Sequence, residues 1–469
     1  MTIIEAQNKL KNTELTSVEL TEACLQEIKE MDGAWHAYLN VFRESALDEA
    51  RKSDKRRLNG ELLGELDGIP LAVKDNIMIQ NTVCTAGSKI LSNYRSAFDA
   101  TVIKKIKDQG AVILGKTNMD EFAMGSSTEF SAFGVTKNPH DLDRVPGGSS
   151  GGSAVAVAGH MALGALGSDT GGSIRQPASF CGVVGLKPTY GRVSRSGLIA
   201  MASSFDQIGP LTKTVKDAAL IFSAIQGEDA NDNTTSNIDL FKPIWVNTLE
   251  KLKVGVPYRL WKNQGLDSRV EETLNETIEK MKAQGAEIVD LDLPYTEESL
   301  AVYYLLMPSE VSANLSRFDG MRYGVRKEAL PLFETYQQSR SEGLGEEVKR
   351  RILLGTFALS AGYVDAYYNQ AKKVQTLIRK AYQNAFQDVD VILTPTTPTS
   401  AFKIGEKIND PLAMYLDDIF TVSANVAGLP AVSVPVSTSV GLPIGMQIIG
   451  KWFEEATILA VADLIEQNF

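Results

Sequence analysis

Short apolar runs alternate along this chain with segments whose apolar residues recur every three or four positions. The clearest case joins a strand-like run at 253–257 (KVGVP), a helical pattern with one apolar face over 270–281, and a second alternating run at 289–293. Strand, helix and strand in this order form a βαβ unit. The pattern predicts an α/β fold, with a large mixed central β-sheet covered by helices on both faces.

Other segments extend this pattern. Thr16 followed by Glu19 predicts a capping box at a helix start, and Leu20, Cys24 and Ile28 then share one apolar face. Further expected elements are a buried strand at 111–115, a long helical region at 346–386, a buried strand at 389–395, an antiparallel pair formed by 431–436 and 443–450, and a closing helix at 454–467.

The size of the chain allows more than one arrangement of this sheet. Its 469 residues are enough to bury a stable core without a disulfide or metal. We expect one domain over 1–469, with a second lobe at about 238–400 inserted in or packed on a catalytic core at about 60–230. The polar run at 227–237 predicts a surface loop between the two lobes.

Composition and charge exclude several classes of protein. No apolar run is long enough for a bilayer span, and the first residues lack a signal peptide, so we expect a cytoplasmic protein with no membrane partner. The net charge of −11 disfavours a surface that grips phosphates, so any RNA is expected to be held mainly by a partner. The three cysteines are widely spaced without a CxxC motif, which argues against a disulfide framework and a zinc site.

The three histidines limit the possible catalytic mechanisms. His36, His140 and His160 are the only ones, and none lies near a nucleophile motif such as GxSxG. A reactive serine in this chain therefore needs a base other than histidine.

Two segments rich in glycine and serine, 147–153 (GGSSGGS) and 167–178 (GSDTGGSIRQPA), are the most unusual in the chain. They are open to three interpretations: a flexible linker, a phosphate cradle or a catalytic loop. A compact apolar run follows the first segment, which disfavours a linker, and no lysine stands where a P-loop needs one. Close approach of the backbone to a substrate remains, with N–H groups beside a candidate nucleophile forming an oxyanion hole in outline. These groups belong to Thr170, Gly171, Gly172 and Ser173.

Lys74 is a candidate for the missing base, because it ends the strand-like part of the apolar run 68–77 (GIPLAVKDNI). Burial disfavours the charged amine, and the pKa must fall from about 10.4 toward about 7 or 8 for a lysine to act as a base. Taken alone, a lysine is more often a solvated surface residue.

Together, GIPLAVKDNI, PGGSSGGSA and LGSDTGGSIRQPA resemble the amidase signature family in their order and spacing. The resemblance implies the amidase-signature fold and a triad in which Lys74 is the neutral base, Ser149 a serine on a cis peptide bond that relays the proton, and Ser173 the nucleophile. It also implies that Asp169 and Arg175 hold the nucleophile loop, the alternative being a simple surface salt bridge. A further supporting role falls to Ser150.

Within this family, segments such as FAMGSSTE, ANLSRFDGMRYG and DIFTVSANVAGLP are similar to the glutamine-hydrolysing A subunits of tRNA-dependent amidotransferases. This similarity implies a glutaminase that supplies ammonia for the amidation of tRNA-bound glutamate, with service to tRNA-bound aspartate left open. The implied partners are the B and C subunits of a heterotrimer, with charged tRNA held mainly by the partner. No cofactor or metal is expected in this chain, whereas ATP and Mg are expected at the partner.

The same similarity implies where glutamine binds. Arg351 would hold its carboxylate and Asp418 its ammonium group through charge-assisted hydrogen bonds, with Tyr303 and Tyr304 contributing a contact. From the residues alone, Arg351 fits a solvated helix face, Asp418 a cap and the tyrosines the core. Three more pocket residues are expected at Met124, Gly125 and Ser126.

Two departures and two rival interpretations accompany this hypothesis. Phe130 stands where a polar residue is expected, which predicts an altered pocket or amide entrance, and the chain stops at Phe469, which predicts weaker contact with a partner. A stand-alone amidase acting on another small amide shares all three catalytic motifs. A non-catalytic scaffold would keep the fold but has no need of Lys74, Ser149 and Ser173.

Overall fold

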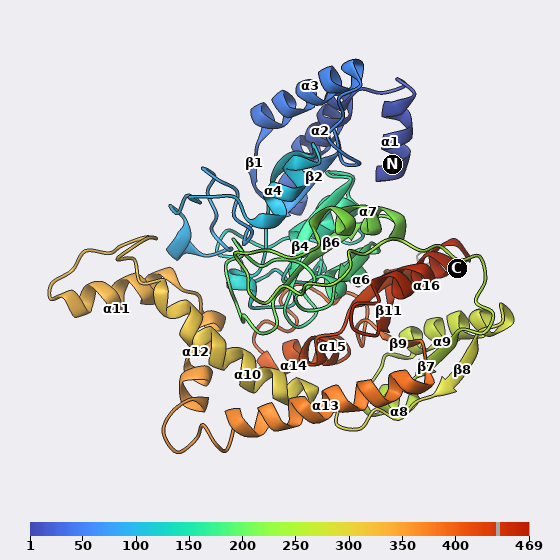
Figure 1. Ribbon diagram of the computed structural model, residues 1–469. Coiled ribbons are helices and arrows are strands. Elements are labelled where there is room, and N and C mark those ends of the chain that lie inside the picture. The colour runs from blue at the N-terminus through green and yellow to red at the C-terminus, as the bar shows by residue number, and fades with distance from the viewer. Residues whose placement is uncertain (438–440, 469) are drawn as a thin grey trace.

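The computed structural model describes residues 1–437 and 441–468, and within them one mixed sheet organises the protein (Figure 1). Phe469, on which the prediction of a weaker partner contact rests, lies outside the described residues. The strands are β1 (Tyr38–Val41), β2 (Pro70–Lys74), β3 (Val112–Thr117), β4 (Gly164–Asp169), β5 (Val184–Lys187), β6 (Gln207–Thr212), β7 (Lys253–Val256), β8 (Glu287–Asp290), β9 (Val391–Pro395), β10 (Ala431–Ser437) and β11 (Ile444–Gly450).

Helices connect these strands. They are α1 (Ile3–Lys11), α2 (Ser17–Trp35), α3 (Arg43–Asn59), α4 (Thr101–Asp108), α5 (Gly151–Ala158), α6 (Arg175–Cys181), α7 (Val215–Ile225), α8 (Tyr258–Asn263), α9 (Ser268–Ala283), α10 (Ser299–Asn314), α11 (Leu332–Gly343), α12 (Glu346–Ala358), α13 (Tyr368–Asp388), α14 (Pro411–Leu416), α15 (Val422–Ala427) and α16 (Glu455–Asn468), with short 3-10 turns η1 (Lys89–Leu91), η2 (Glu121–Ala123) and η3 (Leu315–Arg317).

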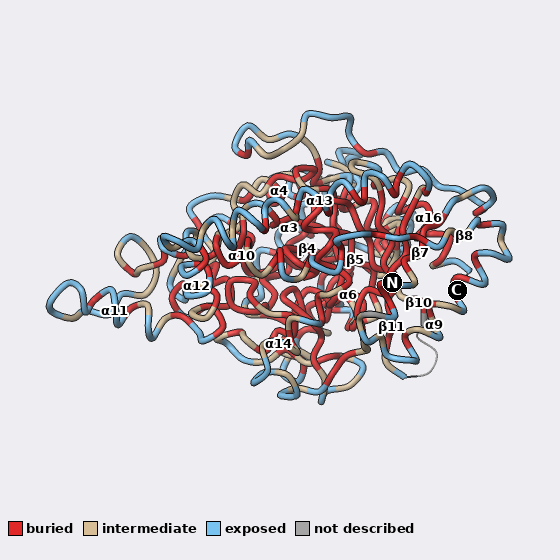
Figure 2. Tube along the Cα trace, turned by 90° about the horizontal axis from the view of Figure 1, so that it is seen from below, coloured by how far each residue is buried: buried red, intermediate tan, exposed pale blue. Residues whose placement is uncertain are grey.

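The strands follow the order β1-β3-β2-β4-β6-β5-β10-β11-β9-β7-β8 across the sheet. β2 is parallel to both β3 and β4, β7 is parallel to both β8 and β9, and antiparallel pairs join these two parts. Every residue of β2, β3, β4 and β6 is buried, so both faces of the central sheet are covered (Figure 2). The predicted α/β fold with a mixed sheet is confirmed. The division into two lobes stays a prediction.

The first predicted helix shows how local sequence sets an element. The Thr16 hydroxyl accepts a hydrogen bond from the Glu19 N–H at 3.1 Å, and the Glu19 carboxylate accepts one from the Thr16 N–H at 2.8 Å. This reciprocal pair is the predicted capping box, and it starts α2. Leu20, Cys24 and Ile28 are buried on one face, as predicted.

Two element boundaries differ from the prediction. The long helical region at 346–386 is two helices, α12 and α13, because the chain turns at 359–367, where Gly362 has a φ of +87°. The strand expected at 289–293 ends at Asp290; Leu291 and Leu293 are buried beyond it, and Pro294 follows. Because Leu291 and Leu293 remain buried beyond the end of β8, the alternating apolar pattern predicted a strand that extends too far.

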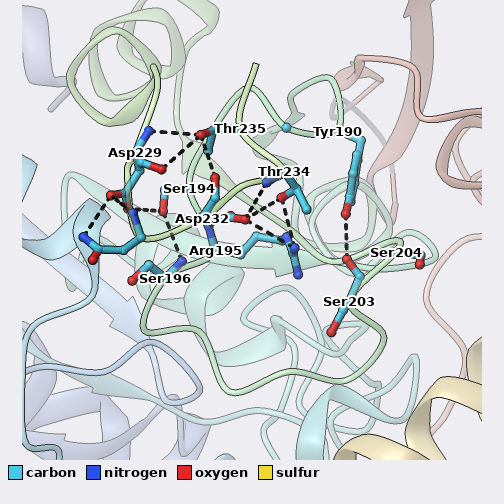
Figure 3. Close-up of polar contacts among 12 residues, drawn as sticks. Tyr190, Ser194, Arg195, Ser196, Ser203, Ser204, Asp229, Asp232, Thr234 and Thr235 are labelled. Atoms are coloured by element: carbon cyan, nitrogen blue, oxygen red, sulfur yellow. Dashed lines mark hydrogen bonds and ion pairs between the residues drawn. The ribbon is translucent and has the colours of Figure 1, made fainter. Parts of the chain in front are cut away.

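The predicted surface loop at 227–237 is confirmed, and two of its carboxylates bind the segment at 194–195 (Figure 3). Asp229 accepts a hydrogen bond from the Ser194 hydroxyl at 2.6 Å, and Asp232 accepts one from the Arg195 N–H at 2.8 Å. Burial tends to raise the pKa of Asp229, but its hydrogen bonds, that from Ser194 first, lower it to about 2. The loop is therefore fixed to the segment that leads into β6.

Candidate active site

Lys74 is the last residue of β2, which lies between β3 and β4, and its side chain is completely buried. Its Nζ atom lies 2.8 Å from Ser149 Oγ, 2.8 Å from Ser150 Oγ and 2.9 Å from Ser168 Oγ. Three hydroxyl groups from two segments therefore surround one amine. The expected position of Lys74 at the end of an apolar strand, away from solvent, agrees with this geometry.

Burial lowers the pKa of Lys74 from its ordinary value to about 7. Three buried carboxylates, Asp120, Asp169 and Asp206, oppose the fall by favouring the charged amine, but burial outweighs them. A large share of the amine is thus neutral near pH 7, the state that a general base requires.

Ser149 lies on the loop between the β3 region and α5, and the peptide bond from Gly148 to Ser149 is cis. The Asp120 N–H donates to Ser149 O at 3.3 Å, and the Gly148 N–H donates to the Gln176 side chain at 2.8 Å. A Cβ added at Gly148 would lie 2.1 Å from Asp120 Oδ2, so this close packing requires glycine. Neighbouring segments thus fix the loop that presents the Ser149 hydroxyl to Lys74.

Ser173 lies on the next loop, between β4 and α6, and it is 8% exposed. The Ser150 N–H donates to Ser173 O at 3.2 Å, which joins the two serine loops. In the described part of the chain, no hydrogen bond connects the Ser149 and Ser173 hydroxyls. The structure therefore brings Lys74 and Ser149 into direct contact and places Ser173 on the adjoining loop; catalytic hydrogen bonds often tighten only when substrate is bound.

The predicted oxyanion groups lie along this loop. The Thr170 hydroxyl donates to Asp206 at 2.7 Å, and the Thr421 hydroxyl donates to Gly171 O at 2.6 Å. Gly172 has a φ of +145°, and a Cβ there would lie 2.3 Å from Thr421 Oγ1. Among the described residues, the N–H groups of Thr170, Gly171, Gly172 and Ser173 donate to no backbone partner outside the helices and strands. Such free, fixed donors are what an oxyanion hole requires.

Asp169 and Arg175 form a two-point ion pair with both side chains fully buried. Arg175 Nε lies 3.0 Å from Asp169 Oδ2, and Nη2 lies 2.9 Å from Oδ1. Burial would raise the pKa of Asp169, but the Arg175 charge lowers it to about 2. Arg175 also donates to Gln447 and to Asn425 at 2.5 Å each. The alternative of a simple surface salt bridge is therefore wrong, and the pair ties the nucleophile loop to β11 and α15.

Arg351 lies on α12 and is buried, so the solvated helix face expected from the sequence alone is wrong. Its Nε donates to Glu347 at 2.7 Å, and its guanidinium lies 5.4 Å from the ring centre of Tyr304 and 5.3 Å from that of Tyr415. Burial raises the pKa of Asp418, and the nearby Arg351 charge opposes the rise. Arg351 therefore contacts Tyr304, and its charge acts on the carboxyl group of Asp418.

Tyr303 packs against the nucleophile loop. A Cβ added at Gly171 would lie 2.8 Å from Tyr303 Cζ, and Tyr303 itself contacts Tyr304 edge to face, with ring centres 5.1 Å apart. The tyrosine pair thus forms a continuous series of contacts from Arg351 to Gly171 of the nucleophile loop.

The segment with Met124, Gly125 and Ser126 passes beside the serine loops. The Gln176 amide donates to Ser126 O at 2.8 Å, and a Cβ added at Gly125 would lie 2.4 Å from Asp120 Cγ. Phe130 lies a few residues further on and packs partly buried against a side cluster that includes Phe402. Its ring therefore fills an apolar cluster near the segment, and its effect on the pocket stays a prediction.

Sequence reasoning missed several residues of the site. Ser168 contacts Lys74 and lies within the second glycine- and serine-rich segment, so its place one residue before Asp169 was a usable signal. Glu347 lies four residues before Arg351 on α12, so the i,i+4 spacing of opposite charges was a usable signal. Tyr415 gave no signal, because only the folded chain brings its hydroxyl to Glu347. In the described residues, no three His, Cys, Asp or Glu side chains are grouped to hold a metal, and no helix is long and apolar enough to cross a membrane.

The chain belongs to the amidase family: the family model described as Amidase matches residues 19–459. Two relatives, each named as the A subunit of glutamyl-tRNA(Gln) amidotransferase, are 52% identical to it. That of Thermoanaerobacter pseudethanolicus is matched over 100% of this chain and 96% of its own length, and that of Persephonella marina over 98% and 96%.

A crystal structure of the protein of the same name from Thermotoga maritima has a TM-score of 0.80 and 44% identity, over 100% of this chain and 94% of that one. The resemblance stated from the sequence motifs is confirmed.

Proposed function

We propose that this protein hydrolyses glutamine as the A subunit of a glutamyl-tRNA(Gln) amidotransferase. The observation that carries the proposal is the buried amine of Lys74, 2.8 Å from Ser149 Oγ, with a pKa lowered by burial to about 7. Full-length similarity to relatives of this name favours this function over a stand-alone amidase.

In the proposed reaction, neutral Lys74 takes a proton from Ser149 while Ser149 takes one from Ser173. Ser173 Oγ then forms a bond to the side-chain amide carbon of glutamine, and the N–H groups at 170–173 stabilise the negative oxygen. The proton returns through Ser149 to the leaving nitrogen, so that ammonia departs and an ester on Ser173 remains. Water cleaves this ester, releases glutamate and restores the hydroxyl.

We assign substrate specificity to a proposed polar pocket formed by Arg351, Asp418, Tyr303 and Tyr304. Arg351 binds the glutamine carboxylate and Asp418 its ammonium group, while Tyr303 and Tyr304 line the space between. Met124, Gly125 and Ser126 form the adjoining wall. The contacts of Arg351 with Tyr304, of Tyr304 with Tyr303 and of Tyr303 with the nucleophile loop support these roles.

We further propose that ammonia passes to a partner, the B subunit, which uses ATP and Mg to amidate tRNA-bound glutamate in a cytoplasmic heterotrimer that also contains the C subunit. An apolar surface supports a protein partner: Leu330, Phe333 and Leu353 are 91%, 73% and 69% exposed around α11, which projects from the body of the molecule (Figure 1). The net charge of −11 supports binding of charged tRNA mainly through the partner.

Replacement of Ser173 by alanine tests the function, because it removes the attacking oxygen. Glutamine hydrolysis by the assembled complex should fall to background, while amidation with added ammonium salts continues. Retained glutaminase activity in this variant would reject Ser173 as the nucleophile.

A further inference from the structure

Glu121 is a buried carboxylate outside the proposed triad and pocket. It contacts the start of α12, and its neighbour Asp120 contacts the loop that carries Ser149. It begins the short turn η2 and is 3% exposed. One carboxylate oxygen accepts a hydrogen bond from the Ser88 hydroxyl, and the other accepts one from the Gly345 N–H at 2.8 Å. Both oxygens are therefore used, and one of them binds a backbone group far away in the sequence.

Gly345 is the residue immediately before α12. It is the N-cap residue, and without a side chain it provides no side-chain cap bond to the helix. Its own N–H is one of the donors at the helix start that have no partner within the helix, and the carboxylate of Glu121 accepts from it, as the N3 side chain does in a capping box. A negative charge at this end is also favoured by the helix dipole. A Cβ at Gly345 would lie 2.3 Å from Glu121 Oε2, so glycine permits this approach.

The first two turns of α12 carry one side of the substrate pocket. Glu347 accepts hydrogen bonds from Arg351 Nε at 2.7 Å and from the Tyr415 hydroxyl at 2.9 Å. Tyr415 in turn stacks on Tyr304, with ring centres 3.9 Å apart. The position of the helix start therefore decides where the Arg351 guanidinium lies.

The other side of Glu121 leads to the catalytic serines. Its neighbour Asp120 donates its N–H to Ser149 O at 3.3 Å, and the Asp120 carboxylate accepts from the Thr128 N–H at 2.9 Å. Two consecutive residues thus contact the serine loop and the start of α12, which makes this turn a direct link between the triad and the pocket.

We propose that Glu121 is a positioning residue that sets Arg351 at the correct distance from Ser173 by anchoring the start of α12. The inference rests on the proposed glutaminase function. Without the anchor, Arg351 occupies its binding position in a smaller fraction of molecules, and the apparent affinity for glutamine falls by that fraction. The bond-making groups on the serine loops stay in place, so the effect falls on KM rather than on kcat.

The experiment compares Glu121→Ala and Glu121→Gln in the assembled complex by glutaminase kinetics. Glu121→Ala should raise KM for glutamine about tenfold, the scale expected for a lost helix cap, and leave kcat within about twofold. Glutamine at this position can accept from Gly345 and donate to Ser88 Oγ, so Glu121→Gln should restore KM to near the wild-type value. An unchanged KM in Glu121→Ala would overturn the inference.

Glu466 provides a matched control. Its carboxylate accepts hydrogen bonds from the Val215 N–H at 3.0 and 3.2 Å, at the start of α7, on a helix that carries none of the proposed site residues. Glu466→Ala should lower stability without raising KM. An equal rise in KM in this control would show a general structural effect and would overturn the positioning role.

A double-mutant cycle with Arg351→Ala identifies the route. Because Glu121 is proposed to act through Arg351, Glu121→Ala should add no further rise in KM in that background. Fully additive effects, or unchanged hydrogen exchange of the amides at 345–351 in Glu121→Ala, would overturn the inference while leaving the proposed function intact. A wild-type complex without glutaminase activity would instead contradict the proposed function.

Discussion

The guanidinium of Arg175 meets the carboxylate of Asp169 at two points, with both side chains completely removed from solvent. Asp169 ends β4 and Arg175 begins α6, so the pair closes the loop that carries Ser173. The remaining Arg175 donors reach Thr421 O at 2.9 Å and Gln447 at 2.5 Å. The two charges are thus paired and hydrogen-bonded, as burial of charge requires.

Asp169→Asn should destabilise the protein by about 3 to 5 kcal/mol, because it leaves the Arg175 charge buried without its partner. Chemical denaturation followed by circular dichroism measures the free energy of unfolding. Asp48→Asn is the control: its ion pair with Arg51 is exposed, and its loss should cost less than about 1 kcal/mol. Equal losses in the two variants would contradict the role of burial.

Lys74→Ala should lower glutamine-dependent amidation by about 10²- to 10⁴-fold, the usual range for a general base. Added ammonium salts should restore amidation, because the role of Lys74 ends with the release of ammonia. The measurement is tRNA amidation by the complex with either nitrogen source. Loss of amidation with both nitrogen sources would show that Lys74 is needed for the stability of the complex and would contradict its role as the base.

The rate of glutamine hydrolysis should depend on pH through Lys74. Only the neutral amine acts as a base, so kcat/KM should rise about tenfold per pH unit below about pH 7 and level off above it. Stability should change with pH in the same direction. Between about pH 7 and the ordinary pKa of 10.5, Lys74 binds more protons in the unfolded chain than in the folded protein. The contribution of Lys74 to the free energy of unfolding therefore rises with pH in this range. A profile that falls from about pH 6 to about pH 8 would exclude a neutral lysine base.

Gly172→Ala should lower kcat by about 10²-fold or more, the scale of a lost oxyanion donor, because the new Cβ meets Thr421 Oγ1 and displaces the N–H groups. Gly33→Ala is the matched control, since a Cβ there meets nothing within 4 Å and Gly33 lies inside α2. This control should keep full activity and gain stability of up to about 1 kcal/mol. Steady-state kinetics of both variants measure kcat. An unchanged kcat in Gly172→Ala would contradict the assignment of Gly172 to the oxyanion hole.

Local patterns predicted the elements that depend on local physics. The capping box of Thr16 and Glu19 and the buried strand ending at Lys74 were both readable, because neighbouring residues determine them. Burial of Arg351 was not readable from its helix, since it depends on Tyr304 and Tyr415 packing from other segments.

Among the site residues, the proposed triad and its supports Ser150, Asp169 and Arg175 came from motifs, whereas other supports depend on tertiary contacts. Asp206 holds the Thr170 hydroxyl, and Thr421 holds Gly171 O, although each lies far from its partner along the chain. An isolated aspartate or threonine carries no signal of such a contact, and only folding brings the two groups within hydrogen-bonding distance.

The tight packing around Lys74 makes dryness a requirement for catalysis. Its pKa is about 7 because burial excludes water from the amine. A substitution that lets water reach this nitrogen would raise the pKa of Lys74 and protonate the amine. The protonated amine cannot act as a base, even with every reacting atom in place and the fold intact. Activity in this protein therefore depends on the exclusion of water from the core beneath the serine loops.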